Sequence, residues 1–63
     1  MNNEEMDRAW REDMEFDHTL RVAQGSLEDL WSATRENPRW SAKAEALLKL
    51  IREERDRIVR RWD

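Results

Sequence analysis

The chain has 63 residues, of which 43% are charged, and its net charge is −3. The absence of cysteine excludes disulfides, thiol catalysis and cysteine-ligated zinc, while one glycine and one proline are too few for the turns of a multi-stranded sheet. We therefore expect a single small all-α domain over residues 1–63. Four tryptophans, each in phase with other apolar residues, favour a folded chain over a disordered one.

A first amphipathic helix is expected to begin at Asn2 or Asn3. With Asn2 as the N-cap, Glu5 takes the capping-box position. At about 100° per residue, one face of this helix carries Met6, Ala9, Trp10, Phe16, Leu20 and Ala23. Asp13 and Asp17 fall within the same face, so we expect that stripe either to be half-buried there or to meet basic side chains.

Gly25-Ser26 is the first signal for a break, since glycine suits the position just past a helix end and serine suits an N-cap. The following residues Leu27, Leu30 and Trp31 nevertheless continue the apolar phase of the first helix. A division of this segment into two helices at Gly25-Ser26 remains an alternative. The unbroken phase favours one kinked or continuous helix from about residue 3 to about residue 36.

The sequence Glu36-Asn37-Pro38 predicts a firm boundary, because the residue before a proline avoids the α conformation. Pro38 fits the first helical position with Asn37 as N-cap, and Ser41 is the rival N-cap. A last helix is expected to run to about Trp62. Its apolar face contains Trp40, Ala44, Leu47, Leu48, Ile51, Ile58, Val59 and Trp62.

Two helices with a short connection predict an antiparallel hairpin. One seam between two helices cannot bury four tryptophans, and a chain of this size without disulfides commonly depends on oligomerisation. We therefore expect a homodimer that forms a helical bundle. Such a dimer would be similar in size and architecture to Rop-type plasmid proteins, a likeness carried by no particular residue.

The charge distribution predicts how the helices pair. Residues 1–31 hold nine acidic and three basic side chains, whereas residues 32–63 hold six acidic and nine basic ones. A hairpin lays the acidic half beside the basic half. Arg55 interrupts the apolar stripe of the last helix, so we expect it to meet Asp13 or Asp17, within the hairpin or across a dimer.

Catalytic and metal sites are not expected. Glu15-x-x-His18 has the spacing found in carboxylate-bridged di-iron bundles, but His18 falls on the polar face, so metal binding is a remote alternative. The serines fit helix caps or surfaces, and no glycine-rich loop is present for phosphate binding. We expect no enzyme, no cofactor and no small-molecule substrate.

An arginine-rich last helix raises the alternative of an RNA- or DNA-binding dimer. Its candidate residues are Arg52, Arg57, Arg60 and Arg61. Acidic residues interleave with these arginines, and i, i+4 pairs such as Arg52–Asp56, Glu53–Arg57 and Asp56–Arg60 suit an exposed, ion-paired face. Nucleic-acid binders instead show a clean basic stripe.

Tryptophan and arginine dominate the energetic centres of protein interfaces, so a protein partner is the preferred expectation. Trp31 and Trp40 are expected in the core. The candidate partner- or dimer-binding residues are Trp10, Leu47, Ile51, Arg55, Ile58 and Trp62. We expect a small regulator or adaptor, of the inhibitor, antitoxin, phage or plasmid type.

The location is expected to be cytoplasmic with no membrane contact. No apolar run approaches the roughly 18 residues of a membrane span. The acidic start MNNEEMDR lacks the basic-then-apolar order of a signal peptide.

Overall fold

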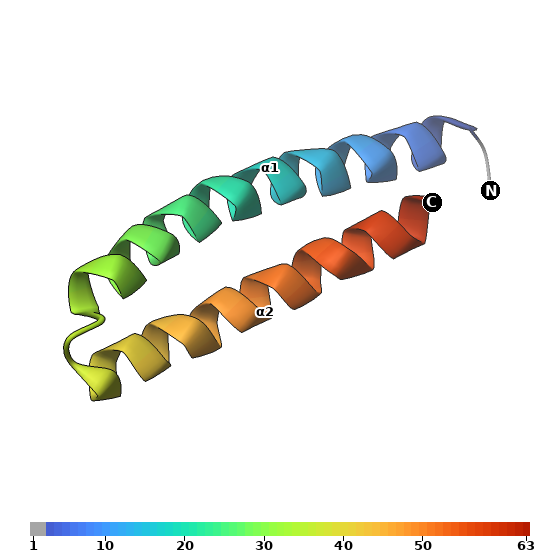
Figure 1. Cartoon of the computed structure of the whole chain (residues 1–63). Coiled ribbons are helices and arrows are strands. Elements are labelled where there is room, and N and C mark those ends of the chain that lie inside the picture. Colours follow the sequence, from blue (N-terminus) through green and yellow to red (C-terminus); the bar gives the residue numbers. More distant parts are fainter. Residues whose placement is uncertain (1–2) are drawn as a thin grey trace.

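The computed structural model describes residues 3–63 as two helices that form an antiparallel hairpin (Figure 1). Helix α1 spans Asn3–Thr34 and helix α2 spans Pro38–Trp62. The predicted all-α hairpin is therefore confirmed. Asn2, the expected N-cap of the first helix, lies outside the described residues.

The turn between the helices is built by Asn37. Its side chain accepts a hydrogen bond from the Trp40 amide (3.3 Å), and its own amide donates to the Thr34 carbonyl (2.8 Å). Pro38 follows at the start of α2, where a missing amide proton costs nothing. The prediction of Asn37 as N-cap is confirmed. The rival Ser41 lies inside the helix, where its hydroxyl donates to the Pro38 carbonyl.

Helix α1 passes through Gly25 and Ser26 without interruption, as the apolar phase predicted. A methyl group at Gly25 would meet no atom within 4 Å, so no close packing contact explains the glycine. The helix ends at Thr34, two residues before the expected end. The Thr34 hydroxyl donates to the Leu30 carbonyl (2.8 Å) in the last turn.

The two helices meet along one seam whose positions alternate three and four residues apart, the spacing of coiled-coil packing. The seam positions of α2 are Ser41, Ala44, Leu48, Ile51, Arg55, Ile58 and Trp62. The seam positions of α1 facing them are Asp13, Asp17, Leu20, Gln24, Leu27, Trp31 and Thr34. All of these side chains are buried or half-buried.

Burial in the hairpin is shallow. Within residues 3–63, Ala44, Leu48 and Ile58 are the fully buried side chains, and all three belong to α2. The expectation that Trp40 lies in the core is wrong, because 57% of its surface is exposed. A single neighbouring helix covers a narrower strip than the stripe that periodicity assigned to the core.

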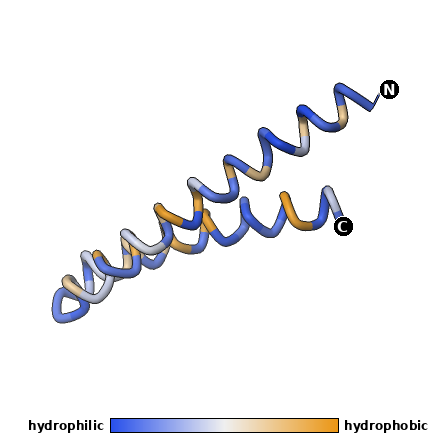
Figure 2. Tube along the Cα trace, turned by 90° about the horizontal axis from the view of Figure 1, so that it is seen from above, coloured by the Kyte–Doolittle hydropathy of each residue, from blue (hydrophilic) through white to orange (hydrophobic). Residues whose placement is uncertain are grey.

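Several other residues of the predicted faces are also exposed. They are Met6, Trp10 and Phe16 of α1, and Leu47 and Val59 of α2. Figure 2 shows hydrophobic positions recurring along both helices between hydrophilic ones. Neither helix of the described chain is long and apolar enough to cross a membrane.

The uninterrupted α1 makes Gly25→Ala a stabilising substitution. Alanine is favoured over glycine in an exposed helix interior by about 1 kcal/mol, and here the added methyl group meets no neighbour. A gain of that size raises the melting temperature of a domain this small by about 4–8 °C. Thermal unfolding followed by circular dichroism measures the change, and a lower melting temperature would show that α1 breaks at Gly25.

Candidate binding surface

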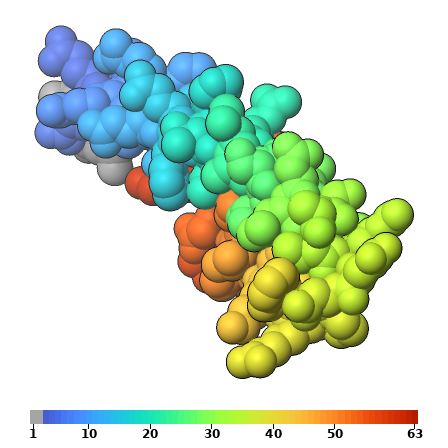
Figure 3. Space-filling model, turned by 90° about the vertical axis from the view of Figure 1, so that its left-hand side faces the viewer, coloured from blue at the N-terminus to red at the C-terminus, as the bar shows by residue number. Residues whose placement is uncertain are grey.

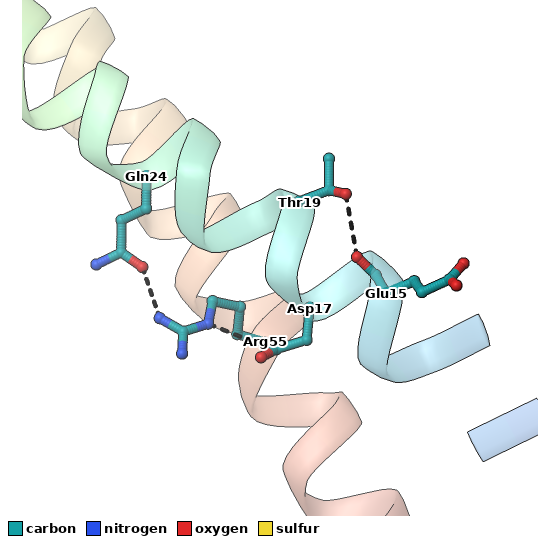
Figure 4. A network of polar contacts seen from close by, with 5 residues as sticks. All are labelled: Glu15, Asp17, Thr19, Gln24 and Arg55. Carbon is teal, nitrogen blue, oxygen red and sulfur yellow. Dashed lines mark hydrogen bonds and ion pairs between the residues drawn. The ribbon is translucent and has the colours of Figure 1, made fainter. Parts of the chain in front are cut away.

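A polar cluster lies in the middle of the seam (Figure 4). Arg55 of α2 donates from Nε to Asp17 Oδ1 (3.1 Å) and from Nη1 to Gln24 Oε1 (2.9 Å). The prediction that Arg55 meets Asp13 or Asp17 is confirmed for Asp17. One guanidinium thereby reaches across two turns of α1. Moving either helix by one heptad would separate these groups, so the cluster specifies the register of the hairpin.

A second polar group closes the seam at the end of α2. The Trp62 indole donates to Asp13 Oδ2 (2.7 Å), and Arg61 Nη1 lies 3.3 Å from the same oxygen. The Arg61 guanidinium also lies 5.4 Å from the centre of the Trp62 ring, within cation–π range. Trp62, expected at a partner interface, is therefore half-buried against its own α1.

Helix α1 extends beyond this closing contact. We call its projecting part, Asn3–Glu12, the open end, because α2 finishes opposite Asp13. Figure 1 shows these first turns extending past the end of α2, and in Figure 3 they form one end of the molecule. Met6 and Trp10 continue the three-four spacing of the seam into the open end and are 44% and 48% exposed.

One side of the seam is charged. Glu28 of α1 and Glu45, Lys49 and Arg52 of α2 line a hollow of about 480 Å³ there. Trp31 also borders it, and its indole donates to Glu45 Oε1 (3.1 Å). Trp31 was expected in the core, and the structure places it half-buried at the edge of the seam.

The other side of the seam is largely apolar. We call it the apolar flank, and its residues are Phe16, Ala23, Leu30, Trp40 and Leu47. Within each helix these residues are seven positions apart, which keeps them in one row. Glu54 stands seven positions after Leu47 and so continues the row of α2. It shares a shallow hollow with Phe16 of α1. The rows of the two helices therefore lie on the same side of the seam.

The outer arginines of α2 mostly meet acidic partners. Arg60 pairs with Asp56 (2.9 Å), as the spacing predicted, whereas Arg57 pairs with Glu54 in place of Glu53. Arg61 pairs with Asp13 of the other helix. Arg52 borders the charged hollow beside Glu28 and Glu45. The candidate nucleic-acid residues therefore lie among carboxylates on several faces instead of forming one basic stripe.

The structure separates the residues predicted to bind a partner into three groups. Ile51, Arg55, Ile58 and Trp62 lie at seam positions and are buried or half-buried, and Arg55 and Trp62 bond to α1. Leu47 lies on the apolar flank, and Trp10 lies at the open end. Two exposed surfaces, not one, thus remain for partners.

Periodicity alone missed several contacts of this surface. Gln24 was not expected in the polar cluster, and neither indole hydrogen bond was expected. Each involves a polar atom at the tip of a long side chain. The contact of Gln24 could have been predicted from its place in the seam, because a polar side chain buried there needs a hydrogen-bond partner.

His18 is exposed on the outside of α1, and the Glu15 carbonyl beside it accepts a hydrogen bond from the Thr19 hydroxyl (3.0 Å; Figure 4). Among residues 3–63, no three histidine or carboxylate side chains gather as metal ligands would.

No family model, curated protein or solved structure matches this chain. The candidate surfaces therefore rest on geometry alone.

The polar cluster generates a prediction about paired substitutions. Arg55→Leu alone removes the donor from both Asp17 and Gln24, and Asp17→Leu alone leaves Arg55 with Gln24 as its remaining partner in the cluster, so each should lower the free energy of unfolding by about 1–3 kcal/mol. The double substitution removes both polar groups and should be less destabilising than either single change. Urea unfolding of the four proteins measures this coupling, and additive losses would show that the contact does not form.

Proposed function

We propose that this chain is a small regulator or adaptor that acts in the cytoplasm by binding another protein. The observation that supports the proposal is the open end of α1. Met6 and Trp10 occupy seam positions there and are 44% and 48% exposed. A tryptophan in such a position is the type of residue that dominates the energy of protein interfaces.

The chemistry of the open end defines the partner it fits. Residues 3–12 hold four acidic and two basic side chains around the apolar pair. A helix that presents apolar residues at i, i+3, i+4 and i+7 would extend the seam where α2 stops. Basic residues beside those anchors would complement the acidic surroundings. We therefore propose a basic amphipathic helix of another protein as the bound element.

The nucleic-acid alternative has less support. Arg57, Arg60 and Arg61 each have a carboxylate partner, so binding a phosphate would require them to exchange one ion pair for another. The overall charge of −3 also opposes the approach of a polyanion. Binding to RNA or DNA is retained as an outcome that the experiments below detect.

Trp10→Ala tests the proposed protein contact. The tagged chain is used to recover partners from its native host, with and without nuclease, and affinity is then measured for the recovered protein. Trp10→Ala should weaken binding at least tenfold, since truncating a central tryptophan commonly costs 2 kcal/mol or more. Val22→Ala is the matched control, because Val22 is 61% exposed on the outer face of α1. Equal affinities of the two variants would contradict the proposal.

The double variant Arg57→Gln, Arg60→Gln separates the protein partner from a nucleic acid. Arg61 is kept because it closes the seam with Asp13. Partner affinity should change less than threefold, because both arginines lie on α2 and outside the open end, and its salt dependence should match that of the wild type. Phosphate contacts would instead lower affinity by about 0.9 log units per contact for each tenfold rise in salt. Nuclease-sensitive recovery together with loss of binding in this variant would identify a nucleic-acid partner.

A further inference from the structure

The apolar flank is a second exposed surface, distinct from the open end. Phe16, Leu30 and Leu47 are 50%, 45% and 46% exposed, although each lies beside the seam. Helices of an isolated two-stranded coiled coil need apolar residues at the seam positions alone. Helices that face a bundle core carry an additional apolar row on one side of the seam. Both helices of this hairpin carry that row, and on the same side.

The whole side of the hairpin that carries the apolar flank is close in size to a stable interface. The 25 residues of α2 extend about 37 Å at 1.5 Å per residue, and two helices side by side are about 20 Å wide. The face therefore presents on the order of 700 Å² per copy. Stable protein interfaces bury about 800 Å² per partner.

The charges of the two helices indicate what covers this face. Helix α1 holds nine acidic and three basic side chains, and helix α2 holds four acidic and eight basic ones. Each helix is therefore complementary to the other. A second copy of the chain supplies both signs together, which a partner with one dominant charge does not.

The same charges select the symmetry of the pair. A two-fold axis parallel to the helices places α1 of each copy against α2 of the other, acidic against basic. A two-fold axis perpendicular to the helices places α1 against α1 and α2 against α2, so that helices of like charge face each other. We propose that two copies pack apolar flank to apolar flank around a parallel two-fold axis. Both turns then lie at the same end of a four-helix bundle.

Contacts within one hairpin indicate which residues meet in this arrangement. Trp31 reaches Glu45, so Leu30 and Leu47 lie at nearly the same level along the hairpin. Asp13 reaches Arg61, so Glu12 is level with the end of α2. Across the parallel axis, Leu30 faces the second copy's Leu47, and Glu12 faces its basic last turn. Apolar residues thus meet apolar ones, and acidic residues meet basic ones.

A distance between the two turns tests the symmetry. The chain has no cysteine, so Glu36→Cys in the exposed turn provides a single site for a spin label. With helices of a bundle 8–10 Å apart, the parallel axis predicts a label separation below about 30 Å. The perpendicular axis separates the turns by about 37 Å, the length of α2 along which the two hairpins overlap. Pulsed dipolar spectroscopy that finds only the long distance, or no distance, would overturn the proposal.

Leu47→Glu tests the surface itself, with Val22→Glu as the matched control on the outer face. Sedimentation at micromolar concentration should show a dimer for the wild type and Val22→Glu, and at least a tenfold weaker dimer for Leu47→Glu. Circular dichroism checks that Leu47→Glu remains helical, and the label distance tests the proposal independently if it does not. A wild-type chain that is folded and monomeric would overturn the proposal.

This dimer is separate from the proposed adaptor function. Trp10→Ala lies outside the apolar flank and should leave the dimer intact while it weakens binding of another protein. Loss of the dimer in Trp10→Ala would place the second copy on the open end and overturn the assignment of the flank.

Discussion

Two helices can bury only the side chains that lie between them, and this limit governs the whole molecule. The seam fully buries Ala44, Leu48 and Ile58 and leaves several larger apolar side chains in water. A core this thin leaves little area for hydrophobic stabilisation. Every apolar residue outside the seam is therefore surface that either remains solvated or meets another chain.

Polar side chains occupy seam positions that apolar ones would fill in a more stable hairpin. Arg55 bonds to Asp17 and Gln24, and Asp13 bonds to Trp62. Each of these contacts joins one helix to a particular level of the other. Apolar contacts slide more readily between registers, because they lack direction. The hairpin thus combines a short apolar seam with polar contacts that favour one alignment.

The hairpin fold could be predicted from local features of the sequence, namely helix-capping residues, the phase of apolar residues and opposite charges in the two stripes. Asn37 and Pro38 specify the end of one helix and the start of the next through their own backbone preferences. The phase of Leu27 and Trp31 indicated a continuous α1 despite Gly25. The meeting of Arg55 with Asp17 was predictable, because opposite charges interrupted the two facing stripes.

The exposure of Trp40 was not predictable in the same way. Periodicity identifies an apolar face but not its width, and the width depends on how many neighbours a helix has. The indole contacts of Trp31 and Trp62 were missed because they depend on where the tip of a long side chain points. Assigning each candidate residue to the seam, the apolar flank or the open end required knowing how far one helix is shifted along the other, which periodicity does not give.

The three-residue turn also shapes how the hairpin forms. Trp31 and Glu45 are 14 residues apart in the chain, whereas Asp13 and Trp62 are 49 apart. Contacts near the turn close short loops, and each one shortens the loop that the next contact must close. Folding that spreads from Asn37 toward the termini therefore avoids any large entropic step, as is typical of fast-folding helical proteins. The same order in reverse makes the termini the first region to open, so amide protons near Trp62 should exchange before those near Ala44.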